Sequence, residues 1–287
     1  MKIIKEIEAL QSIADFNRAT LKKIGFVPTM GFLHDGHVSL ILNARKECDI
    51  VVVSIFVNPT QFGPNEDFEK YPRDFLRDFH ICKSSGVDYV FLPDRETVYP
   101  ENFLTEVKVK GITDRFEGKF RPGHFTGVAT IVNKLVNIVK PHYLYVGQKD
   151  AQQAVVLRKM AEDLNLDLEV RVCETMREET KLAMSSRNSY LTKEEKSEAA
   201  VLYEALTEGK KMITDYKVTD TGAVMKFMEN FIKRKSSNLM LQYLAVTDNY
   251  LMQEIEDLKN YEGEVVISLA AYLGKTRLID NIIFSYK

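Results

Sequence analysis

The sequence is poor in cysteine and lacks long apolar runs. Its three cysteines, Cys48, Cys82 and Cys173, form no CxxC pair and accompany no histidine cluster at zinc spacing. This pattern predicts reduced thiols packed among apolar side chains, not disulfides or a metal site. No stretch approaches the ~18–20 apolar residues that a membrane span needs, and residues 1–8 lack the apolar core of a signal peptide. We therefore expect a soluble, cytoplasmic protein with no membrane partner.

The sequence also lacks an excess of charge of either sign. Its 39 basic residues nearly balance its 41 acidic residues, which gives a formal net charge of −2. A general electrostatic binder of nucleic acid needs a basic excess, so this composition argues against nucleic acid as a partner. It leaves room for a local cationic pocket. A chain of 287 residues is long enough for two domains.

Short β-rich apolar runs alternate with helical patterns over about the first 175 residues. This alternation predicts parallel βαβ units and an α/β fold with a doubly wound sheet, whose ligands bind at the carboxyl ends of the strands. Pro72 fits the first position of the second helix. The expected strands are 24–27, 50–56, 89–92, 105–109, 143–146 and 168–172, and the expected helices are 36–47, 73–84, 126–139 and 151–164.

The pattern changes near Met176, where the βαβ alternation ends. Thr192 and Glu195 form a capping box that predicts a long helix to about Ile213. A second helix over 222–234 and strands at 241–246, 265–271 and 277–284 follow. We expect residues 1–175 to form the first domain and residues 176–287 a smaller α+β domain. The junction at 176–188 is a candidate ligand site, because clefts between domains commonly bind ligands.

The segment that points most directly to chemistry contains His34, Gly36 and His37, between a predicted strand and a predicted helix. Residues three apart share a helix face, so both imidazoles should point the same way. The positive end of the helix lies beside them, which predicts a phosphate site. Two neighbouring histidines alone are more often structural; the strand–turn–helix setting favours the functional interpretation.

Two further segments combine polar side chains with turn residues. Asn58 and Gln61 follow a predicted strand and offer amides that suit a hydroxy-carboxylate ligand, although their spacing alone favours a simple turn at Asn58-Pro59. Residues 116–127 contain three glycines, a proline, two basic residues and His124. We expect a mobile loop without regular structure that closes over an anionic substrate, with an ordinary solvated loop as the alternative.

Two segments offer groups for a nucleotide. In the first, Gly147 ends a predicted strand and permits close approach of a ligand, Lys149 suits phosphate, and Asp150 suits Mg²⁺ or ribose. Gln153 follows one turn later. The second segment, 184–188, has two hydroxyls and the guanidinium of Arg187, which are donors that a triphosphate needs. Its alternative interpretation is an N-cap cluster before the next helix.

Together these segments closely resemble the pantothenate synthetase (pantoate–β-alanine ligase) family. The family motifs PTMGxLHxGH, FVNPxQF, YPR, EGxxRPGHFxGV, GxKDxQQ and MSSRN match residues 28–37, 56–62, 71–73, 117–128, 147–153 and 184–188. The resemblance covers residues 24–191 in order and spacing. Gln148 departs from the Glu of many members, and Met176 stands where Val is commoner.

The resemblance implies a Rossmann-like nucleotidylyltransferase domain and an AMP-forming ligase. ATP and (R)-pantoate would give pantoyl adenylate and pyrophosphate, and β-alanine would then release pantothenate and AMP. It implies Mg²⁺ with ATP, and a homodimer. The implied catalytic residues are His34, His37 (the proton donor), Lys149 and Arg187. The implied ATP-binding residues are Met30, Gly31, Phe32, Leu33, His34, Asp35, Gly36, His37, Gly147, Gln148, Lys149, Asp150, Met176, Met184, Ser185, Ser186 and Arg187. Gln61, Gln153 and Asn58 would bind the acids, and Asp150 the metal.

Two other functions fit parts of this pattern. Adenylyltransferases with a phosphate acceptor share the HxGH motif but need a basic pocket for that acceptor. The candidate acceptor residues here, Asn58, Gln61 and Gln153, are neutral amides and favour a carboxylate alcohol instead. A catalytically silent nucleotide sensor would keep the glycines but has no need of His34, His37 and Lys149.

Overall fold

A computed structural model describes residues 1–64 and 66–287. The chain divides into two compact units. The first comprises Met1–Gly147 and Val156–Glu174, and the second comprises Gln148–Val155 and Thr175–Lys287. Residues 148–155 therefore group with the second unit, which differs from the single boundary after residue 175 expected from the sequence. Within the part of the chain that is described, no helix combines the length and apolarity that crossing a membrane requires.

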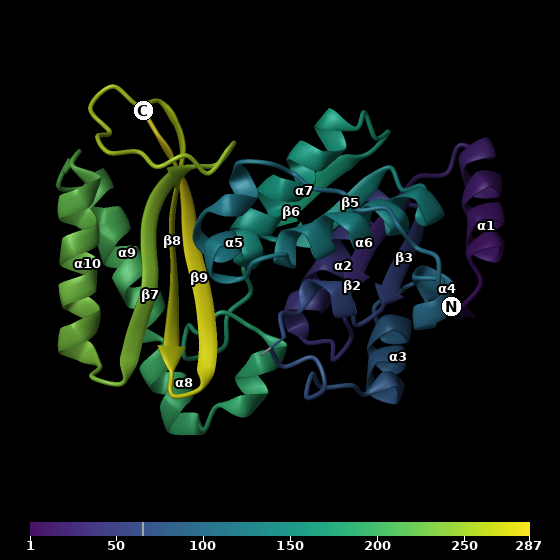
Figure 1. The fold of residues 1–287 in the computed structure, drawn as a ribbon, viewed down its shortest axis with the longest axis horizontal. Helices are drawn as coiled ribbons and strands as arrows, with labels where there is room; N and C mark the ends of the chain where they lie inside the picture. Colours follow the sequence, from purple (N-terminus) through teal and green to yellow (C-terminus); the bar gives the residue numbers. More distant parts are fainter. Residues whose placement is uncertain (65) are drawn as a thin grey trace. The chain divides into compact units, whose positions relative to one another are not determined.

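The first unit is built on a six-stranded sheet in which every neighbouring pair is parallel, with the order β1-β4-β3-β2-β5-β6 (Figure 1). The order reverses at β2, which lies between β3 and β5. This arrangement confirms the predicted α/β fold with a doubly wound parallel sheet. The strands are β1 (Lys2–Ile4), β2 (Ile24–Thr29), β3 (Ile50–Ile55), β4 (Tyr89–Phe91), β5 (Tyr143–Gly147) and β6 (Glu169–Cys173).

The apolar sequence of the central strands explains their position. β3 reads IVVVSI, and Val51, Val52 and Val53 are buried. Such β-branched runs suit strands that are covered on both faces, because no position has to face water. Ile41 and Ala44 of α2 (Asp35–Glu47) pack in the same buried cluster. The sheet therefore holds the start of α2 close to the carboxyl end of β2.

The helices of the first unit agree only in part with the sequence pattern. α3 begins at Phe75, not near Pro72, because the Asp74 carboxylate accepts the hydrogen bond of Arg77 N–H and caps the helix there. Helices also form at 7–19, 95–98 and 116–120, where the pattern predicted none. The helices are α1 (Ile7–Ala19), α2, α3 (Phe75–Ser84), α4 (Arg95–Val98), α5 (Phe116–Phe120) and α6 (His124–Val139), with 3₁₀ turns η1 (Pro59–Gln61) and η2 (Ile112–Asp114). The 3₁₀ turn η3 (Gln148–Asp150) belongs to the second unit, and α7 (Ala151–Asp163) has residues in both units.

The prediction of a strand at 105–109 is wrong, because this segment joins no sheet in the described chain. Val107 N–H instead donates to the hydroxyl of Thr130 on α6. The side chains still alternate: Val107 and Val109 are half-buried, whereas Glu106 and Lys108 are exposed. The segment has the sequence and burial pattern of a strand but lacks a neighbouring strand with which to pair.

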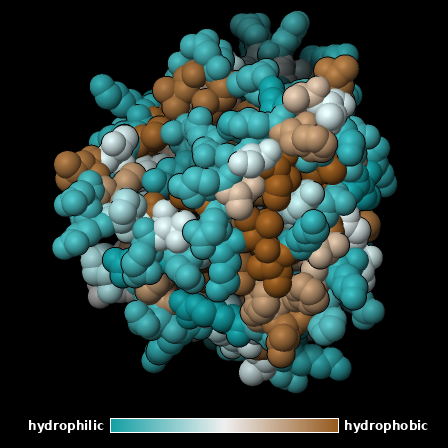
Figure 2. Space-filling view, turned by 90° about the vertical axis from the view of Figure 1, so that its right-hand side faces the viewer, coloured by the Kyte–Doolittle hydropathy of each residue, from teal (hydrophilic) through white to brown (hydrophobic). Residues whose placement is uncertain are grey.

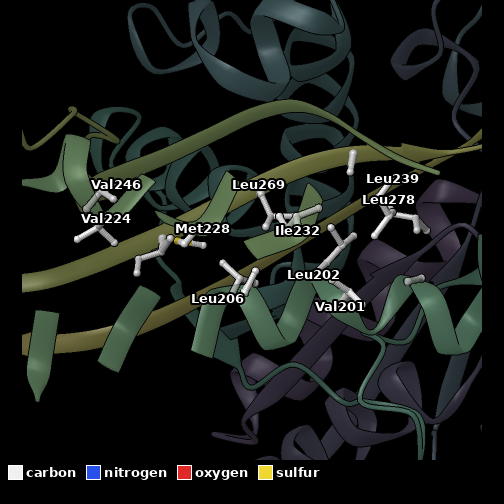
Figure 3. Packing of buried hydrophobic residues seen from close by; sticks show 14 of the residues in the cluster. Val201, Leu202, Leu206, Val224, Met228, Ile232, Leu239, Val246, Leu269 and Leu278 are labelled. Atoms are coloured by element: carbon white, nitrogen blue, oxygen red, sulfur yellow. The ribbon is translucent and has the colours of Figure 1, made fainter. Parts of the chain in front are cut away.

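The second unit packs helices against the antiparallel sheet β7-β8-β9 (Figure 1). The predicted capping box at Thr192 and Glu195 is present, but the expected long helix is divided into α8 and α9 at Ala200. Side chains of α9, α10 and the sheet point toward one another in a closed apolar core (Figure 3). The elements are η4 (Ser186–Tyr190), α8 (Lys193–Ala199), α9 (Val201–Thr214), α10 (Thr221–Lys235), β7 (Leu239–Asp248), β8 (Gly263–Leu273) and β9 (Thr276–Tyr286).

Some large apolar side chains remain on the surface. Figure 2 shows the face on which α1 lies, where brown hydrophobic patches interrupt the hydrophilic surface. Leu104 and Leu21 are the most exposed large apolar residues of the described chain, at 93% and 92%. Leu104 directly precedes the unpaired segment at 105–109.

Candidate active site

The two histidines of the HxGH segment cap α2 through a reciprocal pair of hydrogen bonds. His34 is the N-cap residue, and its Nδ1 accepts from Gly36 N–H at 3.2 Å. His37 Nδ1 accepts from His34 N–H at 3.2 Å. The ring centroids are 4.1 Å apart. The two imidazoles therefore lie side by side, as the spacing predicts.

This capping arrangement sets the tautomer of both neutral rings. Because each Nδ1 accepts from a backbone N–H, the proton of each neutral ring is carried by Nε2. A phosphate site is expected at the positive end of this helix, where backbone N–H groups are normally unpaired. Gly36 N–H is instead bonded to His34. In neutral rings the side-chain donors of this segment are therefore the Nε2–H groups of His34 and His37.

Asp78 of α3 holds the turn that precedes the histidines, and the sequence analysis missed it. Its carboxylate accepts from Phe32 N–H and Leu33 N–H, both at 2.7 Å. The turn needs such support because Gly31 and Phe32 both have positive φ, 81° and 50°. Asp78 is 1% exposed. Burial raises the pKa of its carboxyl, and the two backbone hydrogen bonds oppose that rise.

Asn58 and Gln61 form an amide pair beside Met30. Asn58 Nδ2 donates to Gln61 Oε1 at 3.1 Å, and Gln61 Nε2 lies 3.0 Å from Met30 Sδ. Asn58 is 1% exposed, caps η1 and also accepts from Tyr99 OH at 2.8 Å. The turn interpretation therefore describes Asn58, whose side chain orients the amide of Gln61. Gln61 is half-buried and is better placed to meet a ligand.

Three charged or titratable side chains surround the backbone of Gln61. His124 Nδ1 lies 2.8 Å from Gln61 O, and Arg121 Nη1 lies 3.0 Å from His124 Nε2. Arginine can only donate, so His124 Nε2 accepts and Nδ1–H donates to the carbonyl. Arg121 also makes two hydrogen bonds to Glu66, at 2.7 and 2.6 Å. Burial, with the charge of Arg121, lowers the pKa of His124 to about 4.

The expectation that residues 116–125 lack regular structure is wrong. Phe116–Phe120 form α5, and α6 begins at His124. Gly118 permits this packing, because a Cβ there would lie 1.9 Å from Thr113 O. The glycine serves close approach between backbones and not chain mobility. The Arg121–Glu66 ion pair then ties the segment to the chain after η1.

In the second unit, η3 carries the predicted phosphate-binding segment. Asn281 of β9 donates from Nδ2 to Gln148 O and Lys149 O, both at 2.9 Å. Lys149 Nζ lies 3.7 Å from Asp150 Oδ1. Gln153 follows in the first turn of α7. Asn281 therefore sets the backbone from which Lys149 and Asp150 project, and no local sequence signal identified it.

Residues 184–187 are held by a short antiparallel pairing with 176–177. Met184 N–H donates to Met176 O at 2.9 Å, and a β-bridge joins Arg177 to Ala183. The Arg177 guanidinium makes two hydrogen bonds to Asp280, at 2.6 and 2.9 Å. Asp280 adjoins Asn281, so one stretch of β9 positions both nucleotide-binding candidates of this unit.

Inside the 184–188 segment, hydroxyl and amide groups organise the backbone. Ser185 Oγ accepts from Arg187 N–H at 3.3 Å and caps η4. Asn188 is buried and donates to Glu178 Oε1 at 2.7 Å and to Ala183 O at 3.0 Å. Ser185 therefore caps the 3₁₀ turn η4, whereas Thr192 caps the helix that begins at Lys193, so this segment is not the N-cap cluster of that helix.

The predicted site residues fall into two groups, one in each unit. The first unit brings together Met30–His37, Asn58 and Gln61, and Gly147 ends its strand β5. The second unit carries Gln148, Lys149, Asp150, Gln153, Met176, Met184, Ser185, Ser186 and Arg187. A search of the described residues finds no group of three or more His, Cys, Asp or Glu side chains that could hold a metal ion.

Comparisons with known proteins match the whole chain. The profile of the family described as Pantoate-beta-alanine ligase matches residues 2–283. The pantothenate synthetase of Caldicellulosiruptor bescii is 48% identical over 287 residues and covers all of both chains. That of Acetivibrio thermocellus is 46% identical over 283 residues and covers 99% of each chain.

Solved structures agree with this match. A crystal structure of the Thermus thermophilus pantothenate synthetase superposes with a TM-score of 0.91 at 40% identity, covering 98% of this chain and 99% of that one. The Francisella tularensis pantoate-beta-alanine ligase has a TM-score of 0.79 at 38% identity, with 99% and 97% covered. That structure is described as complexed with Beta-gamma ATP and Beta-alanine.

Replacing Asp78 with alanine should loosen the turn before the histidines. Asp78→Ala leaves the N–H groups of Phe32 and Leu33 without their acceptor, and we expect a loss of about 2–4 kcal/mol of unfolding free energy. Asp74→Ala, on the same helix, removes only an N-cap and should cost about 1 kcal/mol. Urea denaturation measures both losses. Hydrogen exchange at Phe32 and Leu33 should quicken in Asp78→Ala alone, and equal exchange in the two variants would contradict this role.

The depressed pKa of His124 should make stability fall with pH. Between the ordinary pKa of 6.5 and the folded value of about 4, the unfolded chain binds a proton that the folded chain does not. Stability from this group is therefore complete above pH 6.5 and is lost as pH falls, by about 2 kcal/mol at pH 5. His124→Asn keeps a donor near Nδ1 but does not titrate. Urea denaturation measures the difference in unfolding free energy between wild type and variant, which should shrink by about 2 kcal/mol from pH 7 to pH 5. A difference that stays constant would contradict the depressed pKa of His124.

Proposed function

The chain belongs to the pantoate-beta-alanine ligase family, and from this premise we propose how its residues join pantoate to β-alanine at the expense of ATP. It is an ATP-dependent ligase that forms pantothenate. The observation within this chain that carries the proposal is the pair of imidazoles at the start of α2, with both protons held on Nε2. They lie after β2, where the strand order reverses and where doubly wound sheets bind their ligands.

In the proposed first step, a carboxylate oxygen of (R)-pantoate attacks the α-phosphorus of ATP. The bond between that phosphorus and the bridging oxygen of pyrophosphate breaks, and pantoyl adenylate forms. In the second step, the amine of β-alanine attacks the acyl carbon, loses a proton and displaces AMP. The substrates supply both nucleophiles, so the protein contributes positioning and charge stabilisation.

We assign the imidazoles of His34 and His37 to the phosphate oxygens. Negative charge on these oxygens is redistributed as pyrophosphate leaves, and a preoriented N–H donor stabilises that change more than it stabilises bound ATP. The capping bonds hold both rings before ATP arrives, so little reorganisation is needed. His37 acts as the proton donor in this scheme.

We assign cationic and hydroxyl groups of the second unit to ATP as well. Lys149 and Arg187 neutralise the phosphate chain, and Ser186 donates to it. Met176 and Met184 supply apolar contact for the adenine. Gly147, Gln148 and the segment Met30–His37 provide backbone that can approach the nucleotide closely.

Neutral amides suit the acid substrate. Gln61 and Gln153 are proposed to bind pantoate, whose hydroxyls and carboxylate need both donors and acceptors. Asn58 belongs to this group through its hydrogen bond to Gln61, which fixes the orientation of that amide. His124 and Arg121 support the same residue from its backbone side.

Mg²⁺ is proposed to enter with ATP. Asp150 is partly exposed and offers one carboxylate oxygen to the metal, while the phosphates and water would supply the remaining ligands, as is usual for this ion. Bound there, Mg²⁺ would neutralise charge on the phosphates. We also propose that the protein is a homodimer, as the resemblance in sequence implies.

The two-step scheme predicts which substrate triggers pyrophosphate release. Exchange of labelled pyrophosphate into ATP should require pantoate alone, because β-alanine acts only after the adenylate has formed. Release of AMP should require all three substrates. Omitting each in turn is the control, and exchange that depends on β-alanine would overturn the scheme. Turnover with a phosphorylated acceptor in place of pantoate would favour the other HxGH adenylyltransferases.

Removing the Nε2 donor of His37 should slow adenylation more than it weakens ATP binding. We expect His37→Ala to lower the single-turnover adenylation rate by about 10²–10³, or ~2.7–4 kcal/mol. His37→Asn keeps an acceptor for His34 N–H and should lose similar rate with less loss of stability. His37→Gln keeps a donor near Nε2 and should retain more activity.

The second half-reaction provides the internal control for His37. Starting from preformed pantoyl adenylate, the variants should form pantothenate at rates closer to wild type. Calorimetry gives the affinity for ATP separately. An unchanged adenylation rate at saturating ATP would make His37 a binding residue only.

A further inference from the structure

The side-chain amide of Asn58 has a fixed orientation, because it lies between a backbone donor and a backbone acceptor. Thr60 N–H lies toward Oδ1 at 3.4 Å, and Gly127 O lies 3.2 Å from Nδ2. A backbone N–H can only donate and a backbone carbonyl can only accept. Exchanging the oxygen and the nitrogen of Asn58 would bring donor to donor and acceptor to acceptor. Asn58 is buried, so water could not compensate either loss.

This orientation determines which end of the Gln61 amide is left for a ligand. Asn58 Nδ2 also donates to Gln61 Oε1 at 3.1 Å, so the carbonyl end of Gln61 is turned toward Asn58. Gln61 Nε2 lies 3.0 Å from Met30 Sδ. A thioether sulfur is a weak acceptor, and an oxygen of a bound acid can take its place. Gln61 therefore presents N–H to a ligand while its carbonyl oxygen is engaged within the protein.

Tyr99 fastens this arrangement to the rest of the first unit. Its hydroxyl donates to Asn58 Oδ1 at 2.8 Å, a shorter bond than the 3.0 Å from Thr60 Oγ1 to the same oxygen. Thr60 belongs to the same 3₁₀ turn as Gln61 and moves with it. Tyr99 lies 41 residues from Asn58 along the chain, directly after α4. The bond from Tyr99 thus fixes the turn against a separate element of the fold.

The ring of Tyr99 is held by aromatic and cationic neighbours. Its centroid lies 5.2 Å from that of Phe103, in an edge-on contact, and 6.2 Å from that of Phe56. The ammonium group of Lys134 on α6 lies 4.4 Å from the centre of the Phe103 ring and 5.9 Å from that of Tyr99. Packing of this kind restricts the rotamers of the tyrosine. Its hydroxyl is therefore directed at Asn58 before any ligand binds.

We propose that Tyr99 is a positioning residue for the acid substrate, which holds Asn58 in the orientation that makes Gln61 an N–H donor. The inference rests on the proposed function, in which Gln61 binds pantoate. Tyr99 acts through Asn58 and Gln61, without contact to the substrate. A donor that is already oriented loses less conformational freedom when the acid binds. The site accordingly favours an acid that offers an acceptor oxygen to Gln61.

Tyr99→Phe tests the proposal, because it deletes the hydroxyl and keeps the ring. Loss of this hydrogen bond should raise the KM for pantoate by about three- to tenfold, while the KM for ATP and kcat stay near their wild-type values. Tyr261→Phe is the matched control: it deletes a hydroxyl that donates to Glu264 O at 3.0 Å in the second unit, and all three constants should stay unchanged. Release of pyrophosphate, with each substrate varied in turn, gives the constants, and circular dichroism checks that both variants are folded.

A double-mutant cycle with Gln61 separates positioning from a general effect on the structure. If Tyr99 acts through Gln61, then Tyr99→Phe should cause no further rise in the pantoate KM in a Gln61→Ala background. Gln61→Glu places an acceptor where the proposal requires a donor. It should therefore raise the pantoate KM more than Gln61→Ala does.

Three results would overturn the inference. The first is an unchanged pantoate KM in Tyr99→Phe, and the second is an equal rise in the KM for pantoate and for ATP, which would indicate a general loss of structure. The third is a cycle in which the effects of Tyr99→Phe and Gln61→Ala simply add. Each of these leaves the proposed function intact. Failure of that function would instead appear in the wild type, as no release of AMP when all three substrates are present.

Discussion

The carboxylate of Asp78 is the constraint on which the first half of the site depends. Positive φ angles at Gly31 and Phe32 turn the chain sharply between β2 and α2, and such a turn exposes backbone N–H groups to the protein interior. Asp78 accepts two of them from inside α3. Its burial is unfavourable for the charge, but the hydrogen bonds keep the turn, and hence both histidines, in one arrangement.

The second unit uses the same principle with different groups. Two neighbouring residues of β9 hold the 3₁₀ turn η3 and the chain at Arg177. Asp280 holds Arg177, and Asn281 holds the carbonyls of η3. β9 pairs with β8 along its whole length and its sheet packs on an apolar core, so it is a rigid support for Lys149 and for the chain around Met184.

The residues proposed to contact the substrates differ from the residues that hold them in place. Groups proposed to meet substrate, such as the imidazoles and Lys149, are partly accessible. Their supports, Asp78, Asn58 and Asp280, are buried, and each is hydrogen-bonded: Asp78 to backbone N–H groups, Asn58 to Gln61 and Tyr99, and Asp280 to Arg177. His124 belongs to the supports, since its depressed pKa keeps it neutral and leaves its Nδ1–H committed to Gln61. A ligase that acts mainly by positioning its substrates needs these supporting residues as much as the residues that contact the substrates.

Local pattern in the sequence determined the parallel sheet, most of the longer helices, the capping box at Thr192 and the pairing of His34 with His37, because each depends on residues a few positions apart. Tertiary structure alone decided the rest. Asp78 lies 45 residues from the N–H group of Leu33, and Asn281 lies 133 residues from Gln148. Residues 105–109 have every local property of a strand, yet form no ladder in the described chain. Hydrogen bonds between residues that are distant in the sequence produce no periodic pattern in it. Only the folded chain therefore distinguishes the polar side chains available to a ligand from those that hold the backbone in place.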